Sequence, residues 1–171
     1  MNKKLIVAIL SATIFTPNLC SAENLYGVIG YGILDSENAD MGNISLTLGN
    51  SINDVFSIEA AFTFTINKEE LGDGDNLSSS TIGMFAVYQS KGDAYFKGRV
   101  GYSKIDFDLE VLGITFTDDT DGLAYGIGFG FKSGVNAIEF EYTILPDLDS
   151  FIGIQADASN DYVGVGYKVS F

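Results

Sequence analysis

Seven charged residues could do chemistry, because each falls at an alternate position of a segment whose other positions are apolar. They are Glu59, Lys97, Arg99, Lys132, Glu139, Glu141 and Lys168. Carboxylates two residues apart, such as Glu139 and Glu141, could share acid-base work, and a line of charges could conduct ions or protons. Charges confined together could instead pair with one another for structural reasons. The chain has no histidine, so an imidazole base is excluded.

Other catalytic or ligand-binding motifs are weak. The chain has no phosphate-binding loop and no cluster of Cys or His that could ligate a metal. Residues 73–76 and 118–122 are rich in Asp and Gly, but neither segment has the full spacing of a calcium loop or its late glutamate. We therefore expect no catalytic residue, no cofactor and no defined metal site.

The elements that carry the seven charges are strands. Apolar and polar residues alternate with a period of two, which is typical of strands with one apolar face. The pattern predicts an all-β, antiparallel fold of eight strands, although both faces of the fourth strand are apolar and its faces stay unassigned. The expected strands are residues 23–34, 42–52, 55–67, 81–89, 94–107, 122–132, 137–145 and 161–171.

The connections between these strands alternate in length. Long loops are expected after the first, third, fifth and seventh strands, and short turns after the others, as in up-and-down transmembrane β-barrels. Within the longest connection, residues 106–121, apolar residues suggest that the hairpin continues beyond the membrane. A soluble eight-stranded barrel such as a lipocalin is the alternative, with its apolar faces inside. So many Phe, Tyr and Ile side chains would overfill a small interior, so we favour apolar faces turned to lipid.

The final strand, residues 161–171, ends the chain on an aromatic residue. With Gly166, Val169 and Phe171 it resembles the carboxyl-terminal assembly signal of bacterial outer-membrane barrels, although Gly164 replaces a usual polar residue. The chain as a whole resembles small eight-stranded barrels of the OmpX-like and opacity-protein-like kind. The resemblance implies residence in the bacterial outer membrane, contact with its lipid and lipopolysaccharide, and recognition by the barrel-assembly machinery. We expect a monomer.

The amino-terminal segment has the features of a signal peptide. Lys3 and Lys4 precede an apolar run that is too short for a membrane helix, and small residues precede the expected cleavage after Ala22. Cleavage would remove Cys20 and leave one barrel domain, residues 23–171, with 7 basic and 23 acidic residues and a net charge of −16. Such a charge makes nucleic acid an improbable partner.

Chain order places the seven charges near the short turns, and we interpret them as a charge-paired plug of the lumen; an ion or proton path is the alternative. Glycines such as Gly32, Gly126 and Gly164 should leave the outer lumen emptier. They could open a pocket for a small molecule, or make room for Tyr26, Tyr95 and Tyr162.

The resemblance implies a non-enzymatic surface barrel that supports membrane integrity and contacts a host or environmental ligand through its loops. A small-molecule binding or transport barrel is the second hypothesis, and an enzyme acting on outer-leaflet lipid is a remote third. The expected loops hold 17 of the 23 acidic residues. They could be bridged diffusely by divalent cations, or could simply keep the surface solvated.

Overall fold

The structure is a computed structural model, and it describes residues 24–36, 39–67, 69–72, 75–111, 113–151 and 154–171. The expected signal peptide, residues 1–22, lies outside the described residues. No helix among the residues described is both long and apolar enough to cross a membrane.

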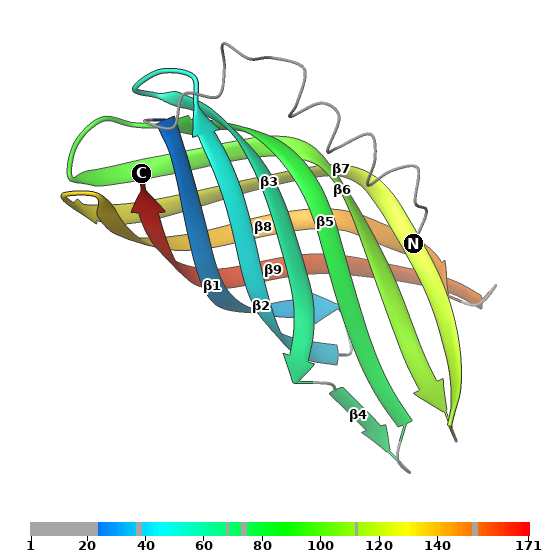
Figure 1. Ribbon diagram of the computed structural model, residues 1–171. Coiled ribbons are helices and arrows are strands. Elements are labelled where there is room, and N and C mark those ends of the chain that lie inside the picture. The colour runs from blue at the N-terminus through cyan, green and yellow to red at the C-terminus, as the bar shows by residue number, and fades with distance from the viewer. Residues whose placement is uncertain (1–23, 37–38, 68, 73–74, 112, 152–153) are drawn as a thin grey trace.

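Eight of the nine strands in the described residues close into an antiparallel barrel (Figure 1). Hydrogen bonding follows the order β3, β2, β1, β9, β8, β7, β6 and β5, and pairing of β3 with β5 closes the ring. The first and last strands are therefore neighbours, with Tyr26 opposite Ser170. The short β4 pairs with β5 outside the ring. The strands are β1 (Leu25–Ser36), β2 (Ala39–Ser51), β3 (Phe56–Asn67), β4 (Glu69–Gly72), β5 (Asp75–Gln89), β6 (Ala94–Val111), β7 (Ile114–Ser133), β8 (Asn136–Phe151) and β9 (Ile154–Ser170).

The outer wall of the barrel carries a belt of exposed apolar side chains. Because side chains alternate across a strand, the residues between them point into the lumen. Tyrosines mark one edge of the belt, where the Tyr142 hydroxyl donates a hydrogen bond to Asp161 at 2.9 Å and Tyr102 donates one to Asp121. Aromatic girdles of this kind are typical of barrels that sit in lipid. The belt includes Ile29, Leu48, Ile58, Phe62, Phe96, Val100, Leu123, Ile127, Ile138 and Val165.

Three short turns lie at one end of the barrel, which we call the turn end. Asn53 organises the first turn, since its side-chain oxygen accepts hydrogen bonds from the backbone nitrogens of Val55 and Phe56 at 2.9 and 3.0 Å. Lys91 of the next turn lies 2.7 Å from Asp54, and this hydrogen bond lowers the pKa of Asp54. In the third turn Gly134 has a φ of 63°, which favours glycine.

The opposite end, which we call the hairpin end, differs from expectation. Three of the expected long loops are paired strands almost to their tips: Ser36 pairs with Ala39, Val111 with Ile114, and Phe151 with Ile154. The expectation that the 106–121 hairpin continues as paired strand is confirmed. The expected long connection at 146–160 is wrong in its extent, since β8 continues to Phe151 and β9 begins at Ile154. An antiparallel ladder satisfies the backbone polar groups outside the membrane as well as within it.

The structure also assigns the faces of the fourth barrel strand, which the sequence left open. In β5 the side chains of Phe85 and Val87 are buried in the lumen, while Ala86 and Tyr88 are exposed on the outer wall. Both faces are apolar because one meets lipid and the other packs inside the barrel. Period-two patterning alone therefore could not distinguish them.

Candidate functional site

Lys97 is the centre of a buried cluster of charges in the half of the lumen nearer the turn end. Its ammonium nitrogen lies 2.8 Å from Glu59 of β3, and 3.1 and 3.5 Å from Glu139 and Glu141 of β8. The Lys97 side chain is 4% exposed and the Glu59 side chain is fully buried. One cation thus holds three carboxylates that come from opposite walls of the barrel.

Arg99 and Lys168 add the remaining positive charges. Arg99 forms an ion pair with Glu141, donates hydrogen bonds to the Thr143 hydroxyl at 2.7 and 3.1 Å, and stacks over the Phe85 ring. Lys168 lies 3.2 Å from Glu139 and 3.8 Å from the centre of the Tyr26 ring. The cluster therefore contains three cations and three carboxylates, and its formal charge is zero.

Two tyrosines complete the hydrogen bonding of the carboxylates. The Tyr26 hydroxyl donates to Glu59 at 2.8 Å, and the Tyr95 hydroxyl donates to Glu139 at 2.6 Å. Both rings are buried. We name Glu59, Lys97, Arg99, Glu139, Glu141 and Lys168, together with Tyr26 and Tyr95, the lumen charge cluster.

Lys132 does not join this cluster, although we predicted that it would. Its side chain is exposed, and no ion pair is found for it among the described residues. Lys132 is the second-last residue of β7 and pairs with Ala137 beside the third turn. At that height the lumen opens to water, so Lys132 lines a polar mouth with Ser51 and Asn136 instead of meeting a carboxylate.

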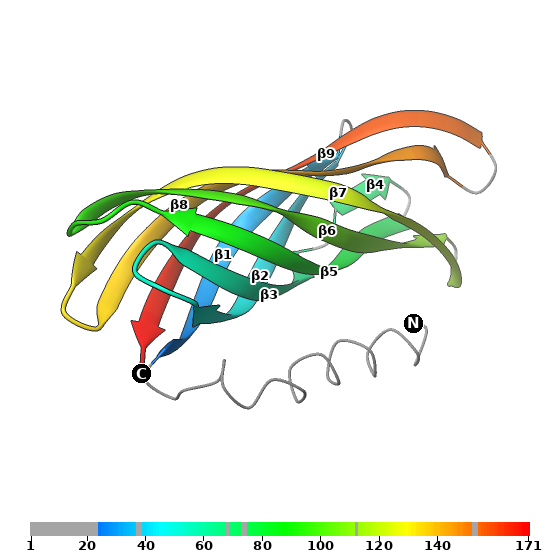
Figure 2. The same cartoon turned by 90° about the horizontal axis from the view of Figure 1, so that it is seen from above.

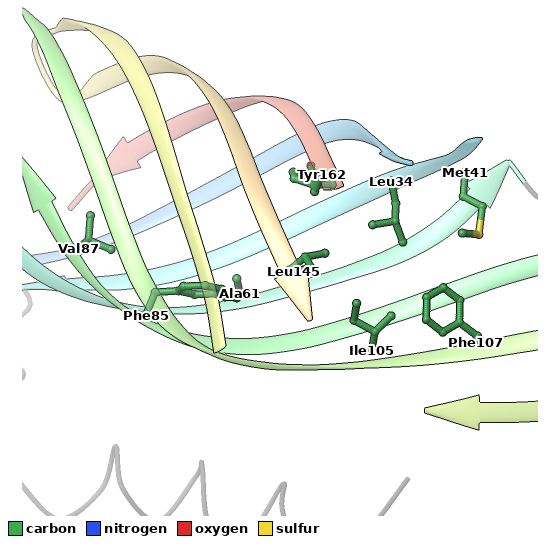
Figure 3. Packing of buried hydrophobic residues seen from close by; sticks show 10 residues of the cluster. Leu34, Met41, Ala61, Phe85, Val87, Ile105, Phe107, Leu145 and Tyr162 are labelled. Atoms are coloured by element: carbon green, nitrogen blue, oxygen red, sulfur yellow. The ribbon is translucent and has the colours of Figure 1, made fainter. Parts of the chain in front are cut away.

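The outer lumen also differs from the emptier space that we expected. Buried apolar side chains fill it, and Figure 3 shows Leu34, Met41, Ile105, Phe107 and Leu145 gathered there. These residues come from the four strands β1, β2, β6 and β8. The hypothesis of an outer-lumen ligand pocket relied on lumen glycines and ignored residues of the expected loops. These loop residues, Met41 and Phe107 among them, lie on paired strands and point inward.

Two of the glycines of the expectation, Gly32 and Gly164, make room for the Tyr162 side chain, since a Cβ atom built on them would lie 2.5 and 2.6 Å from it. Gly126 instead faces the Thr143 side chain.

Two glycines outside the expectation make room for the other two tyrosines. A Cβ atom built on Gly130 would lie 2.4 Å from Cζ of Tyr95, and one built on Gly49 would lie 2.1 Å from Cζ of Tyr26. Both distances are far inside van der Waals contact. These two glycines therefore allow the tyrosine hydroxyls to reach the carboxylates of the lumen charge cluster.

The chemistry that this cluster can perform is limited by its pairing. Each carboxylate lies within 4.0 Å of at least one cation, so none stands ready as an isolated base or nucleophile. Ile105 and Phe107 of the buried apolar cluster follow Arg99 on the inward face of β6, so they lie between these charges and the hairpin end. The arrangement suits a neutral, hydrogen-bonded filling of the lumen.

The sequence could have revealed the tyrosine partners, since Tyr95 lies two residues before Lys97 on the same face.

Acidic side chains dominate the hairpin end. On β6 and β7, Asp106, Asp108, Asp119 and Asp121 lie on the outward face of the hairpin, and Lys104 stands among them. Lys104 forms ion pairs with Asp106 and with Asp119, the latter at 2.9 Å. Partial burial lowers the pKa of Lys104, but hydrogen bonds to these two carboxylates outweigh it and raise the pKa overall. The predicted acidic positions at residues 37 and 73 lie outside the described residues.

The three residues of the expected assembly signal lie on and after β9. Gly166 faces the lumen, where a Cβ atom would lie 2.7 Å from a Val28 methyl group. Val169 pairs with Gly27 of β1, and Phe171 is exposed at the end of the outer wall, with its backbone nitrogen bonded to Leu25 at 2.9 Å. The last strand thus seals the barrel against the first.

A closed antiparallel barrel with an apolar outer belt and a polar, charge-paired lumen defines a membrane-spanning β-barrel of the bacterial outer membrane. The chain matches the family described as outer membrane protein beta-barrel domain over residues 6–171, and it belongs to that family. A comparison with curated protein sequences finds no match.

Solved structures of outer-membrane barrels share the fold. Neisserial surface protein A is 14% identical, with a TM-score of 0.70 over 88% of this chain and 98% of that one. The attachment invasion locus protein Ail of Yersinia pestis, in complex with the heparin analogue sucrose octasulfate, is 13% identical, with a TM-score of 0.60 over 86% and 97%. The amino-terminal barrel domain of Pseudomonas aeruginosa OprF is 8% identical, with a TM-score of 0.64 over 87% and 98%.

Proposed function

We propose that this protein is a non-enzymatic surface barrel that anchors acidic hairpins in the outer membrane and contacts other molecules through them. The observation that carries the proposal is the separation of charge along the barrel. The lumen charge cluster is neutral and buried, whereas the hairpin end holds most of the acidic residues. Short turns face the periplasm in barrels of this class, so the hairpins face outward.

In this proposal the outer wall and the lumen of the barrel stabilise the protein in the membrane. The apolar belt contacts membrane lipid, and the lumen charge cluster fixes the strands around it, so the barrel supports membrane integrity as a monomer. Gly166, Val169 and Phe171 serve as the signal for the assembly machinery. Neither a cofactor nor a catalytic residue is required, and we propose no outer-lumen ligand pocket, since apolar side chains occupy that space.

The charge of the hairpins indicates the chemistry of the partner. A surface with this excess of carboxylates attracts cationic groups and repels anionic ones over about 8–10 Å at physiological ionic strength. The Ail structure contains an anionic sulfated sugar, and a ligand of that kind would be repelled here. We expect a basic partner surface, with divalent cations associating diffusely with the hairpins when no partner is present.

Adhesion of intact cells tests this proposal. Cells that display the protein should adhere to a surface coated with a basic protein, and poorly to a heparin-coated one. Asp108→Asn with Asp121→Asn should weaken adhesion about threefold to tenfold at low salt, because two outward charges are lost. The matched control is Asp54→Asn with Asp93→Asn, which removes the same charge at the turn end and should change nothing. Equal adhesion by cells without the protein would contradict the proposal.

A further inference from the structure

At the hairpin end, one edge of β7 has no neighbouring strand among the described residues. β7 pairs with β6 from Ile114 onward, but β8 pairs with β7 only from Tyr125 onward. Near the point where β7 and β8 separate, the Thr120 hydroxyl donates a hydrogen bond to the Asp147 carbonyl at 2.7 Å. Beyond it the β6–β7 and β8–β9 hairpins diverge, as both views show (Figures 1 and 2). Residues 114–117 of β7 thus have β6 on one side and no strand among the described residues on the other.

A free edge of this kind can accept another strand. In an antiparallel pair every second residue turns its N–H and C=O away from its partner, so an uncovered edge presents a row of donors and acceptors. The local sequence, Ile-Thr-Phe-Thr, consists of β-branched and aromatic residues that favour extended backbone. Neither proline nor lysine interrupts the edge there, although these are the residues that usually protect exposed edges.

The two faces of the same hairpin differ in chemistry. Leu109 pairs with Phe116 and Val111 with Ile114, so four apolar side chains share the face that turns toward the barrel axis. Asp108 and Thr117 pair on the opposite face, where the Thr117 hydroxyl donates a hydrogen bond to Asp108 at 2.7 Å. A strand added beside β7 would therefore place alternate side chains against Ile114 and Phe116 on one face and against Thr115 and Thr117 on the other. On the second face the carboxylates of Asp108 and Glu110 lie one strand further away, on β6, within the reach of long basic side chains.

Lipid does not explain the exposed apolar side chains of this hairpin. Ile114 is 61% exposed and Phe116 is 40% exposed. Ile114 lies nine residues before Leu123 of the apolar belt, and this separation is roughly 30 Å along an extended strand. Even with the tilt of barrel strands, the tip stands well clear of the hydrocarbon.

We propose that the free edge of β7 at residues 114–117 binds an extended strand of a partner protein in which apolar and basic residues alternate. This inference rests on the proposed surface-contact function and specifies its partner. Backbone hydrogen bonds to the edge give affinity, and the alternating faces give specificity. A second copy of this chain fits less well, because its hairpin is acidic too.

Synthetic peptides test the proposal with the full-length protein held in vesicles of zwitterionic phosphatidylcholine. An eight-residue peptide of alternating valine and lysine should bind. A peptide of the same composition with its lysines grouped together should bind at least about tenfold more weakly, because its side chains no longer match the two faces. The alternating peptide with backbone N-methyl groups on both edges should also bind at least about tenfold more weakly, since it cannot extend the sheet.

Protein variants locate the binding. Ile114→Thr with Phe116→Thr keeps the β-forming character of the edge and removes its apolar row, so affinity for the alternating peptide should fall about tenfold or more. Val135→Thr, an exposed apolar position at the turn end, is the control and should leave affinity unchanged. Equal binding of the N-methylated peptide would overturn the inference. So would a dimer that forms without peptide and is lost in the double variant.

Failure of this inference can be told apart from failure of the proposed function. If intact cells adhere to basic protein in a manner that depends on Asp108 and Asp121, while the N-methylated peptide binds as well as its parent, contact is electrostatic only. Surface contact would then stand and strand addition would be wrong. If cells do not adhere, the surface-contact function itself fails, whatever the peptides do.

Discussion

Replacing Lys97 by methionine is expected to lower the free energy of unfolding by about 3–5 kcal/mol, the range typical of breaking a buried ion pair. Methionine keeps much of the volume and removes the charge. Glu59, Glu139 and Glu141 would then share only Arg99 and Lys168, and Glu59 would keep no cation closer than Arg99, at 4.0 Å. The measurement is reversible urea unfolding of the barrel in lipid vesicles, followed by tyrosine fluorescence.

The matched control is Lys132→Met on the same barrel. Lys132 is exposed at the turn end, so its loss should cost no more than about 0.5 kcal/mol. A double-mutant cycle refines the result: Arg99→Ala should couple strongly with Glu141→Gln, its ion-pair partner, and weakly with Glu139→Gln. If Lys97→Met and Lys132→Met had the same small effect, the lumen charge cluster would contribute nothing to stability.

Replacing Ile127 by lysine should destabilise the barrel by about 2–4 kcal/mol in a bilayer, as for cations placed near the middle of the hydrocarbon on a barrel wall. Ile127 is 69% exposed and lies on β7 between Tyr125 and Phe129, within the apolar belt. In water an exposed isoleucine would tolerate this change. The large cost arises only if lipid covers the outer wall.

Val135→Lys supplies the comparison for this measurement. Val135 is exposed in the third turn, beyond the belt, where a lysine remains in water and should change stability by less than about 0.5 kcal/mol. If Ile127→Lys had as small an effect as Val135→Lys in vesicles, residue 127 would not face the hydrocarbon. The assignment of the belt would then be incorrect.

Much of the barrel could be predicted from the sequence because the membrane imposes simple rules on each strand. In residues 55–67 and 122–132, for example, apolar side chains at every second position reach lipid, and small or polar residues between them face the lumen. Closure followed from the lack of any long apolar helix and from the need to satisfy every backbone group in lipid. The alternating lengths of the connections predicted that the short turns and the long hairpins lie at opposite ends of the barrel.

The interior could be predicted less well, because depth within the lumen depends on register and stagger. Lys97 and Lys132 both point inward, but Lys97 pairs with Gly128, which lies two inward positions of β7 deeper in the lumen than Lys132. Strand extension was underestimated for a related reason. Acidic residues at 35, 37 and 40 suggested a loop, whereas beyond the membrane a strand can carry charge on its outer face and apolar side chains on its inner face, as Asp35 and Asp40 do beside Leu34 and Met41.

No pattern in the local sequence predicts the free edge of β7. Both β7 and β8 have strand-like sequences around the point where they separate, and only the observed register shows that their pairing begins at Tyr125. Phe107 of the buried apolar cluster lies on β6, the strand that pairs with β7. The strands that complete the barrel core therefore also form the uncovered hairpin. In the proposed function, anchoring and contact are therefore properties of continuous strands rather than of separate loops.

The central claim, that acidic hairpins project from the cell surface while the short turns face the periplasm, is tested most directly by cysteine labelling. Cleavage of the signal peptide would leave no native cysteine, so Asp119→Cys and Ser133→Cys each provide one thiol. In intact cells, a membrane-impermeant thiol reagent should modify residue 119 and should reach residue 133 only after the outer membrane is permeabilised. Labelling of residue 133 but not residue 119 in intact cells would contradict the account.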